Sequence, residues 1–317
     1  MHALIVGSSG YVGSRLVAHL AAAGHTVTAT ARDPDKLNRF DFPDTVQREE
    51  MDVTDEQSCR RALERVPHVE VAYYLVHSIG GDDYAEHDLD SAQLFAAAAR
   101  RAGVGRIVYL GGFVPAGEEL SEHLESRAEV GEALDSTAVD LVWLRAAVIL
   151  GAGSTSYELI RYLAERLPII PLPAFMNHPV APIAVDDVLR YLAAAGDPAQ
   201  VPPGHYDISN GQTLTYRDLI KQYAQRRNLR RWWIRSRSYP PPSPPRWYRC
   251  SPPSPESSSP TWCKAWETPW TPPTTPSGNW CPTSPAAAPR STRRSTVLPS
   301  ATTSPQWGYA ELPTLSN

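Results

Sequence analysis

Cysteine and long apolar runs are both scarce in this sequence of 317 residues. Among the first 234 residues Cys59 is the only cysteine, which fits a reducing cytoplasm and excludes a disulfide framework there. No apolar stretch is long enough for a membrane span, and the N-terminus enters a predicted strand at once, so neither export nor a span is indicated. The net charge of −4 gives no sign of nucleic-acid binding. We therefore expect a cytoplasmic protein that acts on a small molecule.

Several chemical motifs are also missing. The sequence contains no His-Glu-x-x-His, no Cys-x-x-Cys and no Walker lysine motif. His87 and Asp88 are adjacent, which is the wrong spacing for two metal ligands on one helix face. We therefore predict no metal site.

Leucine, isoleucine and valine nearly vanish after Ile234, where 19 of the 31 prolines and most of the tryptophans lie. Such a composition cannot bury a core and predicts a disordered tail. The tryptophans indicate instead a shifted reading frame, because with GC-rich codons residues 234–239 read one base earlier become Pro-Val-Pro-Val-Leu. Residues 262–280 become Val-Gln-Gly-Leu-Gly-Asn-Pro-Val-Asp-Ala-Ala-Asp-Asp-Ala-Ile-Arg-Glu-Leu. A genuine tail rich in Pro, Ser and Thr is the alternative.

A glycine-rich turn near the N-terminus is the most informative motif. The apolar run at residues 3–6 predicts a buried strand, and residues 11–20 have the spacing of an amphipathic helix. The glycines between them permit a tight turn, the approach of a pyrophosphate, and close packing of helix on strand. Free N–H groups at the helix start would hold the phosphates. We predict a dinucleotide site formed by Gly7, Ser9, Gly10, Tyr11, Val12 and Gly13, with a turn that only joins strand to helix as the alternative.

The end of the next strand bears on which dinucleotide binds. Residues 26–31 are typical of a strand, and Arg32 follows at the position that reads the adenosine ribose. An arginine there accommodates a 2′-phosphate, whereas an acidic residue would bind a free 2′-hydroxyl. Asp33 comes one place later, so the discrimination is not clean. Arg32 favours NADPH over NADH, with Lys36 as a second cation; the alternative is an Arg32 that only faces solvent.

Strands and helices alternate through the first 150 residues. Further strands are expected to end at 51–53 and to cover 71–76, 106–110 and 141–144, with helices at about 55–65 and 84–102. This alternation predicts an α/β fold with a doubly wound parallel Rossmann sheet, whose ligands bind beyond the carboxyl ends of the strands. We assign residues 1–150 to an NAD(P)-binding Rossmann domain, 151–234 to a small and incomplete substrate-binding lobe, and 235–317 to the tail.

Over about residues 1–232 the chain resembles a short-chain dehydrogenase/reductase (SDR) of the extended or atypical kind, close to NmrA-like NAD(P)-binding proteins. The Gly-x-x-Gly-x-x-Gly spacing is that superfamily's variant, and residues 144–151 and 182–188 resemble segments of its extended members. The resemblance implies that Asp52 and Val53 contact the adenine. It also implies that Leu75, Val76 and His77 line the ribose, although an ordinary loop histidine is an equal alternative for His77.

The catalytic residues of that superfamily are missing. Its enzymes typically use a Tyr-x-x-x-Lys pair and a serine at the end of the fifth strand, where this chain has Gly111 and Gly112. His123 and Arg127 stand where the tyrosine and lysine are expected. Imidazole titrates near neutrality, so His123 is a candidate proton donor, although the charge of Arg127 disfavours its protonated form. An exposed helix residue among glutamates is the alternative.

Two functions follow from this pattern. The first is an NADPH-dependent reductase of a small apolar carbonyl or quinone-like substrate, with a proton from His123 or water. The second is a non-catalytic NADPH-binding protein, either a redox sensor or an assembly factor, and its support is the missing Ser, Tyr and Lys.

Overall fold

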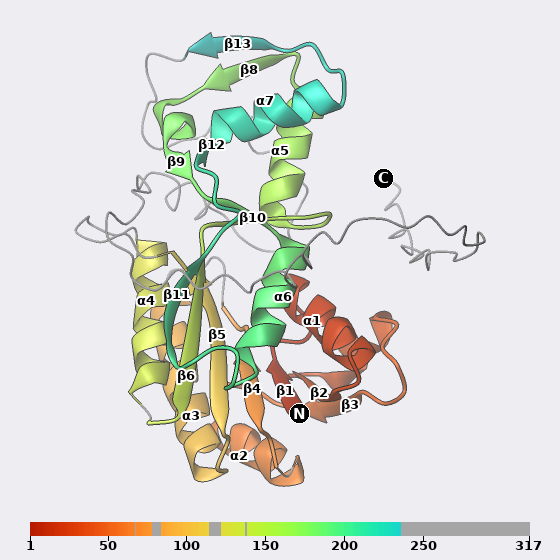
Figure 1. Cartoon of the computed structure of the whole chain (residues 1–317), viewed down its shortest axis with the longest axis vertical. Helices are drawn as coiled ribbons and strands as arrows, with labels where there is room; N and C mark the ends of the chain where they lie inside the picture. The colour runs from red at the N-terminus through yellow and green to blue at the C-terminus, as the bar shows by residue number, and fades with distance from the viewer. Residues whose placement is uncertain (67, 78–83, 114–121, 137, 236–317) are drawn as a thin grey trace, which may run out of the picture. The chain divides into compact units, whose positions relative to one another are not determined.

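A parallel sheet with helices on both faces is the largest sheet of the described residues (Figure 1). The computed structural model describes residues 1–66, 68–77, 84–113, 122–136 and 138–235. Within them, seven strands pair in the order β11-β6-β5-β4-β1-β2-β3, and every pairing is parallel. The strands are β1 (His2–Val6), β2 (Thr26–Ala31), β3 (Gln47–Glu50), β4 (Val71–Tyr74), β5 (Arg106–Gly112), β6 (Asp140–Ala146) and β11 (Gly204–Ile208). The predicted doubly wound Rossmann sheet is confirmed.

Alternate residues of each strand point to two separate hydrophobic cores. Ile5 of β1 joins the core under α1 (Tyr11–Ala22) and α6 (Val185–Ala195). Leu4 joins the core under α2 (Glu56–Arg65), α3 (Tyr84–Arg101) and α4 (Glu122–Asp135). Because both faces are covered, the inner strands β1, β4, β5 and β6 are mostly apolar on both sides, as is usual for parallel sheets, whereas the outer strand β3 is polar and exposed.

Residues from 148 to 235 include a smaller lobe with a core of its own. Its helices are α5 (Thr155–Arg166) and α7 (Tyr216–Arg226), with a 3-10 helix η2 (Ala174–Asn177). Three two-stranded pairs accompany them: β7 (Val148–Leu150) with β10 (Pro182–Ala184), β9 (Pro179–Val180) with β12 (Leu214–Thr215), and β8 (Ile169–Leu172) with β13 (Trp232–Arg235). The apolar faces of α5 and α7 pack together with β8.

Some local predictions differ from the structure: the strand expected over 71–76 ends at Tyr74, for example. The third strand was expected to end at residues 51–53, but β3 ends at Glu50, and Asp52 already turns the chain away from the sheet. The short 3-10 helix η1 (Pro34–Arg39) and the strand β13 were not predicted. Both are too short to show a period in the sequence.

Two kinds of feature are absent from the residues that the structure describes. Among them, no helix combines the length and the apolar character that crossing a membrane requires. That part of the chain also holds no group of three or more His, Cys, Asp or Glu residues able to bind a metal ion.

Candidate functional site

The three glycines of the turn after β1 face three different constraints. Gly7 has φ of +91°, and a Cβ there would lie 2.9 Å from the Leu75 carbonyl oxygen. A Cβ on Gly13 would lie 2.2 Å from the Gly7 carbonyl oxygen, so α1 packs on the turn at a distance that only glycine allows. At Gly10 the nearest atom would be 3.3 Å away. Gly10 is therefore needed least by the fold itself.

Buried hydroxyl groups hold this turn in place. Ser8 is fully buried; its hydroxyl donates to the Ile5 carbonyl at 2.8 Å and accepts the Thr30 N–H at 3.0 Å. Gly10, the N-cap of α1, carries no side chain to cap the helix. The N–H groups of Tyr11, Val12 and Gly13 lie in the first turn, ahead of the Ser14–Gly10 backbone bond. The turn thus presents donors and a helix N-terminus, which suits the phosphates of a dinucleotide.

At the carboxyl end of β2, two charges that are adjacent in sequence have different surroundings. The Asp33 carboxylate accepts the Asp35 N–H at 3.1 Å and so caps η1, and it also pairs with Lys36 at 4.0 Å. Arg32 is exposed and makes no ion pair or side-chain hydrogen bond with any described residue. Asp33 is therefore committed to η1, while the Arg32 guanidinium is available to a ligand.

Arg39, a cation that the sequence analysis missed, lies against the glycine turn. Its guanidinium donates to the Ser9 carbonyl at 2.8 Å and lies over the Phe40 ring at 4.7 Å. The two partners of the hydrogen bond are 30 residues apart in the chain. The 3-10 geometry of η1 brings them together, and η1 had no signal in the sequence beyond Pro34.

Asp52 and Val53 form the turn beyond β3. The Asp52 carboxylate accepts both the backbone N–H and the hydroxyl of Thr54, at 3.0 and 2.8 Å. Val53 is 8% exposed and packs in the core under α2. Beside them, burial raises the pKa of the Cys59 thiol to about 12, with nearby Asp52 adding to the effect. This cysteine is therefore a packing residue, not a reactive thiol.

Leu75, Val76 and His77 follow β4, next to β1 in the sheet. Leu75 donates its N–H to the Val6 carbonyl at 2.9 Å, and its own carbonyl borders Gly7. The side chains of Leu75 and Val76 are half-buried, and His77 is exposed. The strands β3, β2, β1 and β4 are neighbours in the sheet and run in parallel. All the residues predicted to bind cofactor therefore lie together beyond the carboxyl ends of these four strands.

At the end of β5, a tryptophan fills the space beside Gly111, one of the two glycines that stand where the serine was expected. The Trp143 indole nitrogen lies 2.4 Å from where a Cβ on Gly111 would stand, and the same ring fills the space beside Gly131. Trp143 is 4% exposed. Glycine at 111 is thus required by the packing of β6 against α4, which leaves no room for a reactive side chain.

Among the described residues, no tyrosine paired with a lysine lies beyond the carboxyl ends of these strands to donate a proton. The side chain of His123, the predicted donor, lies outside the described residues, although its backbone belongs to α4. Burial raises the pKa of Tyr109 and of Tyr74 above the ordinary value, so both hydroxyls stay protonated near neutrality. Tyr109 donates instead to the Arg127 carbonyl at 3.1 Å.

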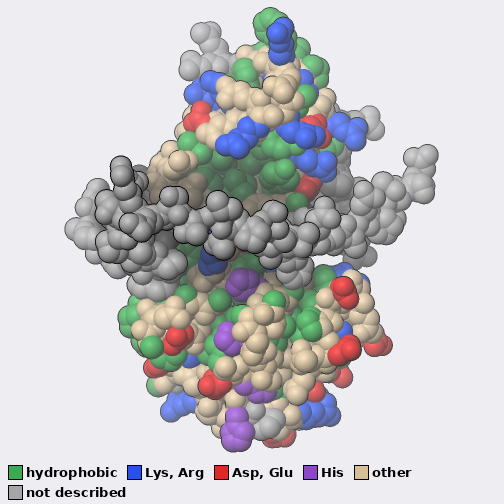
Figure 2. All heavy atoms as spheres, turned by 45° about the vertical axis from the view of Figure 1, so that its right-hand side comes forward, with side chains coloured by type: hydrophobic (Ala, Val, Ile, Leu, Met, Phe, Trp, Pro, Cys, Tyr) green, Lys and Arg blue, Asp and Glu red, His purple; other side chains and the backbone are tan. Residues whose placement is uncertain are grey.

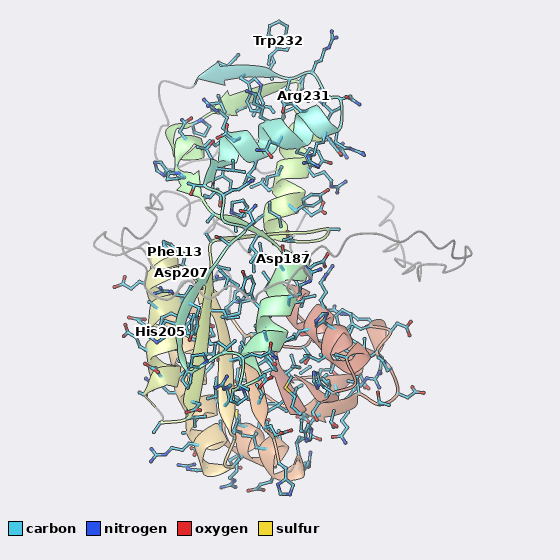
Figure 3. The ribbon with its side chains drawn as sticks, in the orientation of Figure 1. Phe113, Asp187, His205, Asp207, Arg231 and Trp232 are labelled. Atoms are coloured by element: carbon cyan, nitrogen blue, oxygen red, sulfur yellow. The ribbon has the colours of Figure 1, made fainter. Side chains whose placement is uncertain are left out.

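An ion pair and a buried aromatic residue lie near the carboxyl ends of the strands, and the sequence did not predict either of them. Arg145 and Asp207, opposite each other on β6 and β11, form an ion pair of 2.7 Å with side chains 18% and 16% exposed. Phe113, directly after β5, is 8% exposed (Figure 3). A partly buried ion pair and an apolar ring therefore border the sheet end where a substrate would approach.

Helix α1 contacts the start of the smaller lobe. Arg15 stacks on the Tyr11 ring at 4.0 Å and donates to the Ala152 carbonyl at 3.0 Å. A Cβ on Gly151 would lie 2.5 Å from the Tyr11 hydroxyl oxygen, which is buried. The glycine turn and the loop at residues 151–154 are therefore packed together.

A cavity of about 540 Å³ opens between α3 and α4, lined by Gln93, Ala97, Arg100, Arg101, Ala133 and Ser136. None of these residues follows the carboxyl end of a sheet strand. We therefore place the candidate site at the sheet edge and not in this cavity.

Comparison with known proteins gives a family model and many solved structures. Residues 7–161 match the family described as NAD(P)H-binding. No curated protein matches the sequence. Similar structures include UDP-glucose 4-epimerase of Thermotoga maritima with UDP-glucose, at 15% identity and a TM-score of 0.63, covering 76% of this chain and 87% of that one.

Two others are complexes with the cofactor. UDP-glucose 4-epimerase of Thermus thermophilus with NAD has 19% identity and a TM-score of 0.60, covering 75% of this chain and 87% of that one. The Bordetella bronchiseptica enzyme WbmH with NAD+ has 15% identity and a TM-score of 0.60, covering 74% and 85%. These likenesses bear on the fold. Together with the glycine turn, the matched family model makes residues 7–161 similar to NAD(P)H-binding proteins, and the solved structures show the fold.

Proposed function

We propose that the chain binds NADPH in preference to NADH. In this proposal the turn of Gly7, Ser9, Gly10, Tyr11, Val12 and Gly13 holds the pyrophosphate, and Arg32 binds the 2′-phosphate. Asp52 and Val53 border the adenine, while Leu75, Val76 and His77 line the ribose. The supporting observation is the contrast at the end of β2, where Asp33 caps η1 and Arg32 has no partner among the described residues.

Electrostatics supports this selectivity. A carboxylate that is already capped and paired competes poorly for a ribose hydroxyl, whereas an unpaired guanidinium makes strong, charge-assisted hydrogen bonds with a phosphate. Arg39, held on the Ser9 carbonyl, adds a second positive charge beside the turn. Lys36, already paired with Asp33, is the weaker second cation.

Replacement of Arg32 tests this proposal. Arg32→Ala is expected to weaken NADPH binding by about tenfold or more and to leave NADH binding nearly unchanged, because only NADPH carries the 2′-phosphate. Calorimetric titration of both cofactors provides the measurement. Lys36→Ala, which removes a cation from the same 3-10 helix, is the matched control and should change the ratio by much less. An unchanged NADPH affinity in Arg32→Ala would refute the assignment.

We further propose that the bound cofactor reduces a small apolar carbonyl or quinone-like substrate. NADPH supplies a hydride to the acceptor and becomes NADP+, and the acceptor oxygen takes a proton from His123 or water. The apolar border of the site, with Phe113 buried and Leu75 and Val76 half-buried, supports an apolar substrate. The free, buried state of Cys59 is in keeping with the cytoplasmic location that we propose.

A second candidate function is a non-catalytic one, and a specific observation favours it. Trp143 fills the space beside Gly111, one of the two glycines that stand where SDR enzymes carry a serine. A chain that keeps the cofactor turn and packs the catalytic position with an indole suits an NADPH-binding redox sensor of the NmrA-like kind, or an assembly factor.

Turnover separates the two candidates. NADPH oxidation would be followed across a panel of enones, quinones and aldehydes. Reductase function predicts turnover of an apolar acceptor that falls strongly in His123→Ala with unchanged NADPH affinity. Turnover that is unchanged in this variant would remove His123 from the mechanism. NADPH binding without oxidation across the whole panel would favour the sensor.

A further inference from the structure

The ion pair of Arg145 and Asp207 lies near the carboxyl end of the sheet, in line with Gly111. In the register of the strands, Gly111 of β5 is the neighbour of Arg145 on β6, and Arg145 is the neighbour of Asp207 on β11. Neighbours of this kind point to the same face of a sheet. Because Gly111 has no side chain, the row contains only the two charged groups. Figure 3 shows Asp207 and Phe113, the residue that follows β5, at the same end of the sheet.

Asp207 uses only part of the Arg145 guanidinium. The Nε–H of Arg145 donates to an Asp207 carboxylate oxygen at 2.7 Å, and the guanidinium carbon lies 6.0 Å from the centre of the Trp143 ring. The two Nη groups make no hydrogen bond with a described residue. They are also not among the buried polar atoms without a partner, so in a side chain that is 18% exposed they reach solvent. The planar fork therefore keeps two donor groups for a ligand.

Other cations of the molecule are held differently. Lys221, Arg226 and Arg230 of the smaller lobe are exposed, and Figure 2 shows Lys and Arg side chains over the surface of that lobe. Water and salt screen such charges, so each one binds an anion weakly. Arg145 is largely withdrawn from water and is kept in one orientation by Asp207. A hydrogen bond from its guanidinium to a ligand oxygen is therefore stronger and better directed.

We propose that Arg145 binds the oxygen of the substrate, with Asp207 as the residue that positions it. This role rests on the reductase function proposed above. There the pyrophosphate is assigned to the turn after β1 and the adenosine to the ends of β2 and β3, so the nicotinamide half is expected to extend the other way, over β4 and β5 toward β6. As the hydride adds to the carbonyl carbon, the π electrons of the C=O bond move to the oxygen. Arg145 stabilises this negative charge until a proton arrives from His123 or water.

This assignment supplies an oxygen-binding group where the usual serine and tyrosine are missing. A guanidinium stays protonated throughout the physiological pH range, so Arg145 donates hydrogen bonds but does not itself supply the proton. Phe113 lies directly after β5 and is 8% exposed, which gives the same end of the sheet an apolar side chain. The ligand class is therefore an apolar molecule with a carbonyl oxygen, or its reduced alcohol or phenol.

Binding of para-nitrophenolate tests the role of Arg145 without any turnover. The probe has an aromatic ring and a phenolate oxygen, like the reduced form of a quinone, and its absorbance reports binding. In the presence of NADP+ the full-length chain should bind it saturably, and Arg145→Met should weaken this binding by about tenfold or more. Arg145→Lys keeps the charge but loses the planar fork, so it should weaken binding less. NADPH affinity should stay within about twofold in both variants, which would show that the Rossmann part is folded.

Arg65→Met is the matched control, because Arg65 of α2 forms an ion pair of 2.8 Å with Glu49 on the outer strand β3. This variant should bind the probe as tightly as the parent chain. Equal probe affinities of the parent chain and Arg145→Met would overturn the proposal, and so would a parent chain that does not bind the probe. Failure of the reductase function would look different: no acceptor would oxidise NADPH, while the probe would still bind through Arg145.

Discussion

At the scale of single residues, the glycine turn separates the requirements of the fold from those of the ligand. Gly13→Ala places a Cβ 2.2 Å from a backbone oxygen, which cannot move without shifting α1. We expect a loss of roughly 1–3 kcal/mol in the free energy of unfolding, the usual cost of overpacking. Urea denaturation measures it.

Gly10→Ala is the matched control in the same turn. Its Cβ would meet only the Gly7 carbonyl oxygen at 3.3 Å, so the stability should change by less than about 1 kcal/mol. Cofactor affinity should nevertheless fall by about tenfold, because the methyl group would occupy the space for the pyrophosphate. A Gly10→Ala chain that binds NADPH as well as the parent would show that the phosphates lie elsewhere.

Arg106 is a second informative residue, at the opposite edge of the sheet. It is 2% exposed, and one of its nitrogens donates to the Ala195 and Val201 carbonyls at 2.9 and 2.7 Å. Arg106→Met keeps the apolar stem but leaves both carbonyls without this donor, so we expect a loss of about 2 kcal/mol. Arg60→Met, on the exposed surface of α2, should cost far less. Equal stabilities of the two variants by denaturant titration would contradict this assignment.

At the scale of elements, helix α7 begins with a reciprocal cap. The Asp218 N–H donates to the Thr215 hydroxyl at 3.1 Å, and the Thr215 hydroxyl donates to the Asp218 carboxylate at 2.6 Å. The hydrogen bond from this hydroxyl is the main reason why the pKa of Asp218 lies below its ordinary value. The ionised Asp218 in this cap therefore stabilises the folded chain above about pH 4. This stabilisation is lost as the pH falls through the lowered pKa of Asp218.

Thr215→Val removes the hydroxyl and keeps the shape. We expect a loss of about 1 kcal/mol at pH 7 and a smaller loss near pH 2, because the Asp218 carboxylate takes up a proton as the pH falls. Ser154→Ala is the control, because the Ser154 cap of α5 involves no carboxylate and its loss should not depend on pH in this way. Urea denaturation at the two pH values gives both differences. A Thr215→Val effect that is the same at both would show that Asp218 does not contribute.

The elements that the sequence predicts well are those with a local signal. Residues 3–6 and 26–31 are apolar or β-branched runs bounded by glycine, so β1 and β2 were placed correctly, and the glycine spacing marked the start of α1. The pair of β8 and β13 has no such signal, because its partners lie more than 60 residues apart and run for four residues each. Contacts made across the fold were also missed: Arg39 with Ser9, Arg145 with Asp207, and Trp143 with Gly111.

At the scale of the whole molecule, strand order explains why the predicted cofactor residues converge. The glycine turn, Arg32, Asp52 and Leu75 are far apart in the chain, but they follow four neighbouring strands of a parallel sheet. Topology alone thus brings them to one edge. The substrate side has no comparable rule, because the smaller lobe of α5, η2 and α7 is held by short strand pairs and a separate core. This is why the family model and the fold agree on the cofactor and leave the substrate open to experiment.

The most direct test of cofactor binding at this edge is a fluorescence titration of the purified full-length chain with NADPH and, separately, with NADH. We predict saturable binding of NADPH, tighter than that of NADH by about tenfold or more, because the unpaired Arg32 meets the 2′-phosphate. Equal affinities for the two cofactors would contradict the role of Arg32. Binding of neither would contradict the assignment of the glycine turn.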